Sequence, residues 1–409
     1  MATRSPSAAE NQDIATPQGA GGLLPALLQG QRLPALLARV GAWLASIWGR
    51  PFKIGPWVIA ARHADVSEML ARDLDFLIAP INAARIEAVN GPFVLGMDRG
   101  ARLAVEHGAL YAALRAVDKT KIRAEVVRVA AEAIARAGAG SLDVVGDYAR
   151  PIAARTATAL FGISGSDEHL FMDVARAIFA HTFLNIGGDK AIEARALKAA
   201  ALMRAWFEDE IARRRASGEL GHDMMGALMS QRALDDDGVR RTLGGMLVGS
   251  IDTTASAVAK IVKTLGRDSD LRARMILDLD NPARMEGWCA EALRRWPHNP
   301  AMLRSAAAAT QLGTTPVKAG ATVVAWTQAA MLDPSAFPEP ALLTPERPRS
   351  AYLHFGGALH HCAGRSINEF QIPILVGGLL ARGIDRVGRV QWAGPFPDRL
   401  DVDFTGQPQ

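Results

Sequence analysis

The most informative stretch of the chain reads Phe-Gly-Gly-Ala-Leu-His-His-Cys-Ala-Gly and covers residues 355–364. A glycine-rich turn here delivers Cys362 to the start of a predicted helix that runs to about Arg382. Unpaired backbone N–H groups and the helix dipole stabilise a thiolate at such a position. The thiolate can bind a metal, act as a nucleophile or remain an inert core thiol. A loop so rich in glycine also lets a large flat group lie close to it.

The residues around Cys362 disfavour two of these chemistries. No Asn or Asp is positioned to orient the neighbouring histidine, as a cysteine hydrolase requires, and no second cysteine gives zinc its usual ligand spacing. The other cysteine, Cys289, has no such context and is interpreted as a buried helix thiol. Two cysteines in 409 residues exclude a disulfide scaffold and a multi-cysteine metal site. They indicate a reducing compartment, which we take to be the cytoplasm.

A second motif is a long predicted helix with glycines in its middle. It begins near Asp235, ends near Leu265 and contains the run Gly-Gly-Met-Leu-Val-Gly-Ser-Ile-Asp-Thr-Thr over residues 244–254. Each helical glycine costs about 1 kcal/mol relative to alanine, so three within six positions need a reason. One reason is the approach of a large flat group, with Asp252 and Thr253 placing an acid and an alcohol where the backbone is opened. The other is a helix crossing, with a threonine bonded back to a carbonyl.

A third motif lies on a helix that starts at Asn281 and ends before Pro297. Glu291 and Arg294 are three residues apart on it and therefore share a face. They form either a solvent-exposed pair worth about 0.2–0.5 kcal/mol or part of a larger network. Arg347, in the downstream Pro-Glu-Arg-Pro run, can supply a second guanidinium to Glu291. Such an Arg–Glu–Arg network is able to fix a long coil.

The rest of the chain predicts a mainly α fold: a single large helical domain with small β-sheets near its N- and C-terminal parts. We expect residues 1–22 to be a disordered leader and residues 23–409 to form the one domain, with amphipathic helices over 23–48 packed on its body. The further elements expected are strands within 52–61, a helix over 64–71, an irregular loop over 74–97, helices across 100–270, a β-hairpin over 314–326 with a Lys-Ala-Gly turn, coil over 333–349 and short strands in the tail.

Composition excludes several classes of protein. Hydrophobic residues make up 49% and charged residues 22%, so the chain can bury a large core. The net charge of +4 is too evenly spread for nucleic-acid binding. Apolar stretches are interrupted well before the ~20 residues that a membrane-spanning helix needs, so we expect no transmembrane anchor.

In their order and spacing, these motifs resemble the cytochrome P-450 family of haem-thiolate enzymes over about residues 50–405. Glu291 follows Asp252 by 291 − 252 = 39 residues, and Cys362 follows Arg347 by 362 − 347 = 15. The resemblance implies the cytochrome P-450 fold and haem b, with Cys362 as the proximal iron ligand that favours cleavage of the O–O bond. It also implies that Asp252 and Thr253 deliver protons to dioxygen. The family's structural triad corresponds to Glu291, Arg294 and Arg347.

The resemblance also suggests partners for the haem propionates, which need cationic or donor groups. His360 matches the family position two residues before the cysteine, and Arg304 matches the arginine after the Glu-x-x-Arg helix. Near residue 100, two registers make either Arg102 or His107 a candidate, each weighed against a simple surface role. Further residues expected to contact the cofactor are Phe355, Gly356 and Gly249. The chain departs from the family pattern in having Ser250 and Ala358 where glycines are usual, which affects oxygen chemistry and the loop position.

The activity implied is that of a monooxygenase of the soluble bacterial type, inserting one oxygen atom of dioxygen into a lipophilic small molecule. A separate ferredoxin-type donor would supply electrons through basic residues of the helix after residue 118, and we expect a monomer. The alternatives are a peroxide-dependent peroxygenase and a catalytically silent, haem-binding docking relative. The expected walls of the substrate pocket are Phe76, Ile81, Phe93, Phe183, Val248, Met302 and Phe396.

Overall fold

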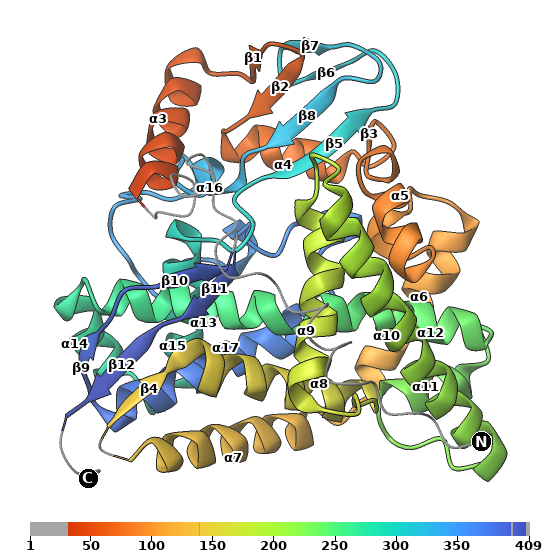
Figure 1. Cartoon of the computed structure of the whole chain (residues 1–409). Coiled ribbons are helices and arrows are strands. Elements are labelled where there is room, and N and C mark those ends of the chain that lie inside the picture. Colours follow the sequence, from red (N-terminus) through yellow and green to blue (C-terminus); the bar gives the residue numbers. More distant parts are fainter. Residues whose placement is uncertain (1–31, 139, 394–395, 406–409) are drawn as a thin grey trace. The chain divides into compact units, whose positions relative to one another are not determined.

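The computed structural model describes residues 32–138, 140–393 and 396–405 (Figure 1). The predicted leader over residues 1–22 lies outside them. The described chain divides into two compact units, and the division falls within continuous helices. Unit 1 contains Asn82–Val126 and Ala149–Ala255, and unit 2 contains the rest. The prediction of a single domain over residues 23–409 stays a prediction.

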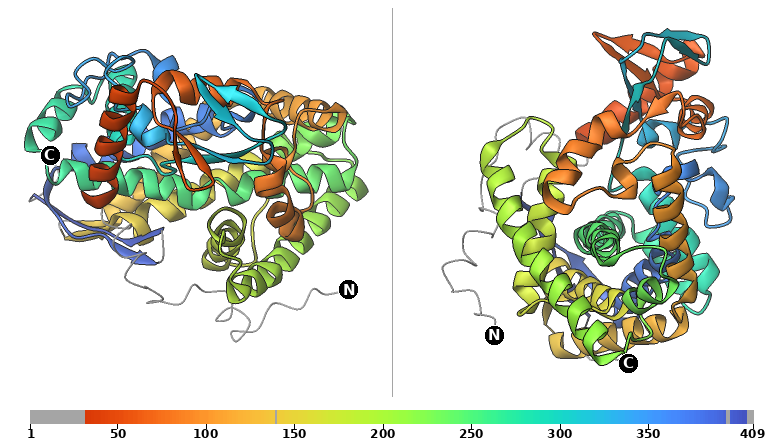
Figure 2. Two further views of the ribbon diagram at one scale, coloured as in Figure 1. Left: turned by 90° about the horizontal axis from the view of Figure 1, so that it is seen from above. Right: turned by 90° about the vertical axis from the view of Figure 1, so that its right-hand side faces the viewer.

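Unit 1 is built from helices. The longest of them, α10 (Lys190–Ser217), packs against α9 (Glu168–Phe179) and α12 (Asp236–Val248), and the first two run side by side in both views of Figure 2. The Asp189 carboxylate caps the N-terminus of α10, and Gly218, at a φ of +75°, ends that helix. The other elements are α5 (Ala79–Asn90), η1 (Val94–Gly96), α6 (Ala101–Ala116), α7 (Lys119–Ala137), α8 (Arg150–Phe161), η3 (Ala180–Leu184), α11 (Met224–Gln231) and α13 (Ile251–Leu265), of which α5, α7 and α13 continue into unit 2.

Unit 2 combines helices with four small sheets. The largest sheet has the strand order β1-β2-β8-β5-β3, and the three-stranded sheet has the order β4-β12-β9. The helical elements are α3 (Arg32–Trp48), α4 (His63–Ala71), η2 (Val144–Ala149), α14 (Ser269–Leu277), α15 (Pro282–Arg295), α16 (Thr327–Ala330), η4 (Arg349–Ala351), η5 (Ala358–His360) and α17 (Arg365–Arg382). The strands are β1 (Phe52–Ile54), β2 (Trp57–Ala60), β3 (Phe76–Leu77), β4 (Ser141–Asp143), β5 (Met302–Ala306), β6 (Thr310–Leu312), β7 (Thr315–Val317), β8 (Thr322–Ala325), β9 (Ile384–Val387), β10 (Gln391–Ala393), β11 (Phe396–Arg399) and β12 (Asp401–Phe404).

Two local predictions are wrong. The irregular loop expected over residues 74–97 is mostly ordered, because it contains β3, helix α5 and the turn η1. Pro80 stands in the first turn of α5, where the missing N–H costs nothing. The hairpin expected over residues 314–326 does not form either. Strand β7 pairs with β6 across a turn at Gly313, whereas β8 joins the large sheet between β2 and β5.

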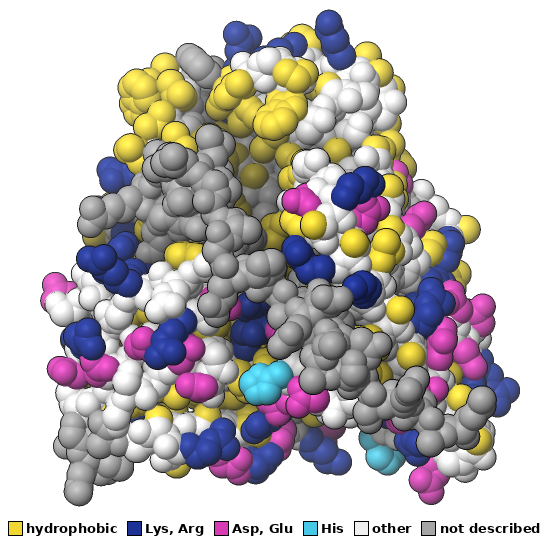
Figure 3. Space-filling model, viewed as in Figure 1, with side chains coloured by type: hydrophobic (Ala, Val, Ile, Leu, Met, Phe, Trp, Pro, Cys, Tyr) yellow, Lys and Arg dark blue, Asp and Glu magenta, His cyan; other side chains and the backbone are white. Residues whose placement is uncertain are grey.

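Helix α3 is amphipathic, as predicted, but it exposes apolar residues as well as burying them. Its Ala38 is buried, and Gly41 lies against the ring of Trp326, so this side packs on the body of unit 2. The opposite side exposes several large apolar side chains, among them Trp43, which is 61% exposed (Figure 3). Within the described residues, no helix combines the length and the hydropathy that crossing a bilayer demands.

The core of unit 2 joins the helix that carries the Glu-x-x-Arg motif to the coil that follows it. Trp288 of α15 is buried, and its indole N–H donates to Asp278 Oδ2 at 2.6 Å. One residue earlier, Gly287 faces the backbone of Pro345 so closely that a Cβ there would collide with the Pro345 carbonyl. The glycine therefore sets how closely the coil can approach α15.

Replacing Gly287 with alanine should force α15 and the coil apart. Overpacking of this kind costs about 1–3 kcal/mol, so G287A should lower the free energy of unfolding by that amount, measured by denaturant titration. The matched control is G377A in α17, where the added Cβ would make ordinary contacts of 3.7 Å. That control should be neutral or stabilising, because alanine is the better helix former. Equal effects of the two substitutions would contradict the packing argument.

Candidate functional site

The cysteine loop places a half-buried sulfur near two backbone N–H groups. The Cys362 N–H donates to the Phe355 carbonyl at 2.9 Å and so closes the turn. At the start of α17, the Arg365 N–H donates to the Cys362 carbonyl at 3.2 Å, and the backbone N–H groups of Gly364 and Arg365 act to lower the pKa of the Cys362 thiol. Gly356 turns the chain at a φ of +72°. The sequence predicted this arrangement of a glycine turn, a cysteine and a helix start.

Burial nevertheless dominates the acidity of this thiol. It raises the pKa of Cys362 above its ordinary value, against the opposing effects of the Gly364 and Arg365 N–H groups and the Arg365 charge. A bound cation would favour the thiolate, for which the two donors are already in place. Among the described residues, no group of three or more His, Cys, Asp or Glu side chains could hold a metal. A metal here would therefore need ligands from outside the protein, as a porphyrin provides, and the cysteine loop fits that requirement.

Ala358 adopts a backbone conformation that is unfavourable for alanine. Its φ is +52°, in the left-handed region where a Cβ is crowded by the following carbonyl. The loop thus keeps the conformation that a glycine would adopt freely, although the side chain is that of alanine. The turn that positions Cys362 therefore contains one strained residue.

Glu291 and Arg294 form a fully buried ion pair. Both side chains are 0% exposed, and the guanidinium meets the carboxylate in a bidentate way at 2.8 and 3.0 Å. Arg347 adds its Nε at 3.3 Å from Glu291 Oε2, and the Tyr352 hydroxyl donates to Oε1 at 2.8 Å. The predicted network forms, and the alternative of a solvent-exposed pair is wrong. Sequence reasoning missed Tyr352, which no motif marks.

Arg294 also binds the coil that leads to the cysteine loop. Its terminal nitrogens donate to the carbonyls of Met331, Pro340 and Leu342 at 2.9–3.0 Å. Its guanidinium also lies 5.0 Å from the centre of the Phe337 ring. One buried charge thus fixes several points of a segment that has little regular structure of its own.

The predicted glycine-containing helix is interrupted at Gly249 and Ser250, which separate α12 from α13. At two of its three glycines, Gly244 and Gly245, a side chain of the protein itself packs against the helix. A Cβ at Gly244 would lie 2.5 Å from Asn90 Oδ1, and one at Gly245 would lie 2.6 Å from the Phe93 ring. No side chain comes within 4 Å of the Cβ position at Gly249. The hypothesis of a flat group approaching the helix therefore applies to Gly249 alone.

Asp252 and Thr253 follow this interruption, and the side chain of each has a polar partner in the protein. The Thr253 hydroxyl donates to the Gly249 carbonyl at 2.5 Å, the back-bonding named in the alternative interpretation. Asp252 is 3% exposed, and its Oδ1 lies 2.7 Å from Arg176 Nη2 and 3.1 Å from Arg150 Nε. Sequence reasoning missed both arginines. The available signal was Arg176 itself, a charged residue on an otherwise apolar stretch of α9.

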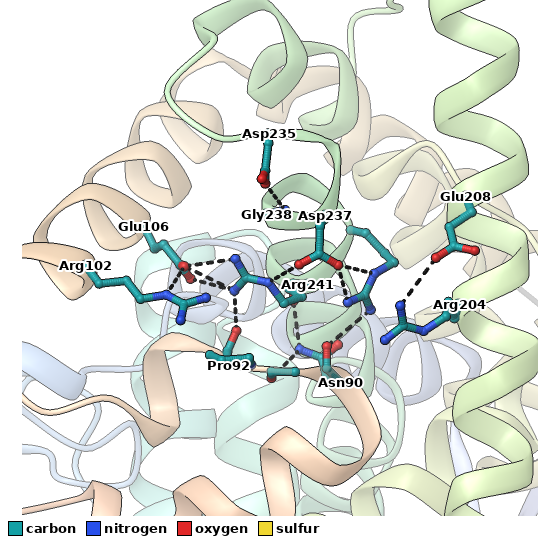
Figure 4. Close-up of polar contacts among 12 residues, drawn as sticks. Asn90, Pro92, Arg102, Glu106, Arg204, Glu208, Asp235, Asp237, Gly238 and Arg241 are labelled. Carbon is teal, nitrogen blue, oxygen red and sulfur yellow. Dashed lines mark hydrogen bonds and ion pairs between the residues drawn. The ribbon is translucent and has the colours of Figure 1, made fainter.

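The structure places Arg102 in an ionic network of unit 1 (Figure 4). Its Nε lies 2.9 Å from Glu106, which is buried and also accepts from both terminal nitrogens of Arg241 at 3.1 Å. Arg241 in turn binds Asp237 at 2.8 Å. His107 stacks on the Tyr111 ring, with 4.4 Å between ring centroids. The roles of Arg102 and His107 beside a propionate stay predictions.

The other predicted partners of the cofactor lie beside the cysteine loop in unit 2. His360 ends the turn η5, two residues before Cys362. On β5, the sulfur of Met302 lies 3.6 Å from the Cβ position of Gly356. Arg304 is two residues further along that strand and therefore shares the face of Met302. The roles of Arg304 and His360 beside the propionates stay predictions.

The predicted pocket residues are apolar and mostly buried, as a lipophilic pocket requires. In unit 2, Phe76 and Phe396 are buried, and Ile81 and Met302 are half-buried. In unit 1, Phe93 and Val248 are buried. The Phe183 ring packs on that of Phe179, with 4.8 Å between their centroids. Their role in binding substrate stays a prediction.

Comparisons with known proteins agree with this geometry. A model of the family described as Cytochrome P450 matches residues 192–382. Nocardicin C N-oxygenase from Nocardia uniformis subsp. tsuyamanensis is 28% identical over 350 residues, covering 81% of this chain and 83% of the relative. Cytochrome P450 109 from Bacillus spizizenii is 26% identical over 248 residues, covering 59% of this chain and 60% of the relative. The solved structure of open cytochrome P450 EryK from S. erythraea superposes with a TM-score of 0.76 at 22% identity, covering 94% of this chain and 98% of that one.

The family model and the curated relatives support a member of the cytochrome P450 family, and the solved structure has the same fold. The predicted family, the mainly α fold class and the haem cofactor with cysteine thiolate ligation are thereby confirmed.

Removing Glu291 should leave the Arg294 guanidinium buried without its counter-charge. An uncompensated buried charge costs about 3–5 kcal/mol, so E291A should lower the free energy of unfolding by that amount. The measurement is denaturant unfolding followed by circular dichroism. The matched control is E132A, which removes an exposed partner of Arg128 on α7 and should cost less than about 1 kcal/mol. A loss in E291A no larger than in E132A would contradict the assigned role.

Proposed function

We propose that this protein is a haem-thiolate monooxygenase that inserts one oxygen atom of dioxygen into a lipophilic small molecule. The observation that carries the proposal is the half-buried Cys362 thiol at a glycine turn, next to the backbone N–H groups of Gly364 and Arg365, which favour its thiolate. The buried Glu291–Arg294 pair fixes the coil that leads to this loop. The Nocardia relative is named an N-oxygenase, which supports oxygen transfer as the activity.

Each element of the proposal has a distinct task in this chain. The bound haem would supply the redox chemistry of oxygen activation. Cys362 would hold its iron, while Arg304 and His360 would bind its propionates. Phe355 and Gly356 would contact it from the cysteine loop, and Gly249, which has no side chain near its Cβ position, would leave room for it on the helix segment before Asp252.

Asp252 and Thr253 would move protons to the reaction. The Thr253 hydroxyl points its own proton at the Gly249 carbonyl, so its oxygen lone pairs can accept a hydrogen bond from water or from a reactant. Arg150 and Arg176 fix the carboxylate of Asp252, the residue before this threonine. The acid–alcohol pair also favours the monooxygenase over the peroxygenase alternative, because a peroxide-driven reaction does not need it. It argues equally against a silent docking relative.

Electrons would come from a separate ferredoxin-type protein. Helix α7 carries Lys119, Lys121 and Arg123 near its start, which gives an acidic donor a complementary charge. Both cysteines are free thiols, which supports a reducing compartment and hence the cytoplasm.

The assignment of the iron ligand is tested by C362S. After reduction and exposure to carbon monoxide, the unaltered protein should show the red-shifted absorption band of a thiolate-ligated haem, and C362S should lose it. The control is C289S, which removes a buried thiol whose pKa burial raises, and which should keep the band. Retention of the band in C362S, or its absence from the folded unaltered protein, would refute the proposal.

The proton-delivery role is tested by T253A. Loss of this hydroxyl should let reducing equivalents continue to be consumed while product falls and hydrogen peroxide accumulates. The ratio of peroxide to product is the readout. T254A is the matched control, because its hydroxyl also donates to a carbonyl four residues back, that of Ser250 at 2.7 Å. If T254A shifts the ratio as much as T253A, or neither shifts it, Thr253 is not the proton-delivering residue.

A further inference from the structure

Arg85 differs from the buried arginines of unit 1. Each of those is paired with a carboxylate: Arg176 with Asp252, Arg214 with Asp223, Arg240 with Asp237 and Arg241 with Glu106. Arg85 is half-buried on α5, yet no carboxylate among the described residues lies within ion-pairing distance of it. Burial lowers the pKa of Arg85, because its guanidinium is removed from water without a carboxylate to balance its charge.

The contacts of Arg85 leave part of its guanidinium available. Its Nε donates to the Thr182 carbonyl at 2.9 Å, and its Nη2 reaches Asn82 Oδ1 at 3.5 Å. Within the described part of the chain, its Nη1 makes no hydrogen bond to the protein. The side chain is therefore held in one orientation with donor capacity left over.

The segment that Arg85 contacts carries two further polar atoms without partners. His181 is 5% exposed and Thr182 is 3% exposed, and neither His181 Nε2 nor Thr182 Oγ1 has a hydrogen-bond partner among the described residues. Buried polar atoms are rarely left unpaired in folded proteins, so a group from outside the chain is the natural explanation.

Both of these atoms are donors. The Asn185 carboxamide is oriented by Asp189, whose N–H donates to Asn185 Oδ1 at 2.7 Å while Asn185 Nδ2 donates to the Asp189 carbonyl at 2.9 Å. Asn185 Nδ2 also lies 3.3 Å from His181 Nδ1, so this ring nitrogen is the acceptor. Burial lowers the pKa of His181, which leaves the ring neutral with its proton on Nε2. The unpaired atoms are thus an imidazole N–H and a hydroxyl, next to a guanidinium.

We propose that Arg85, together with His181 and Thr182, binds a carboxylate group of the substrate. A carboxylate accepts hydrogen bonds only, carries the missing negative charge and is the preferred partner of a guanidinium. The adjoining Phe179–Phe183 ring pair offers an apolar surface to the rest of the molecule. The substrate class is therefore a lipophilic acid, which rests on the proposed monooxygenase function and narrows its substrate.

Arg85 could instead serve only to cap the end of η3 through the Thr182 carbonyl. The two roles differ in what they predict for charged and uncharged ligands. A capping arginine would affect both kinds of ligand equally, through the fold of the segment. A carboxylate-binding arginine would affect the acid alone.

The experiment compares octanoate, dodecanoate and hexadecanoate with their methyl esters. Binding to the holoenzyme is measured by calorimetry, which needs no assumption about the iron ligand, and in parallel by the spin-state change of the haem. At least one acid should bind about ten- to a hundredfold more tightly than its ester, as expected for charge-assisted hydrogen bonds. R85Q should abolish this preference without weakening the ester, R85K should keep part of it, and T182V should reduce it severalfold.

The matched control is R115Q, which removes an exposed arginine of α6 and should leave the preference unchanged. Three results would overturn the proposal: no acid that binds more tightly than its ester, a preference that survives in R85Q, or an R85Q effect of equal size on acid and ester. Because C362S and the carbon monoxide spectrum test the iron ligand separately, failure of the carboxylate site is distinguishable from failure of the proposed function.

Discussion

The buried ion pair of Glu291 and Arg294 is the contact on which the coil leading to the cysteine loop depends. Two charges without any solvent exposure are expensive to desolvate, and they are tolerated only because each is fully paired. The carboxylate is shared with Arg347 and Tyr352, and the guanidinium with three coil carbonyls. These contacts fix the conformation of the coil that precedes the cysteine loop, although this coil contains no strand and no long helix. The cysteine loop is reached through this coil.

The parts of the site that could be predicted from sequence are those whose residues lie close together in the chain. The glycine turn with Cys362 and the Glu291–Arg294 spacing are local patterns, and the structure contains both as predicted. The partners of Asp252 come instead from α8 and α9. Arg150 lies 252 − 150 = 102 residues earlier and Arg176 lies 252 − 176 = 76 residues earlier, so no local pattern pairs them with Asp252. The same holds for Phe93 against Gly245. The glycines predicted a close approach, by a flat group or by a crossing helix, but not which residue would make it.

Strand pairing was the least predictable part of the fold. Alternating residues over 314–326 are compatible with a hairpin, and only the large sheet decides that β8 pairs with β2 and β5 instead of β7. The helix over residues 79–90 was hidden by its proline and asparagines, which are typical of loops but are equally accepted at helix ends. In both cases tertiary contacts outweigh local preference.

The left-handed backbone of Ala358 makes the cysteine loop sensitive to the support it receives from the rest of unit 2. Such a conformation costs an alanine about 1–2 kcal/mol, so the surrounding contacts must supply at least that much to maintain it. If those contacts weaken, relaxation of a single peptide would release the strain and displace the sulfur four residues later. The loop is thus poised to open locally before the helices around it unfold, and cofactor retention would decline at lower temperature than secondary structure.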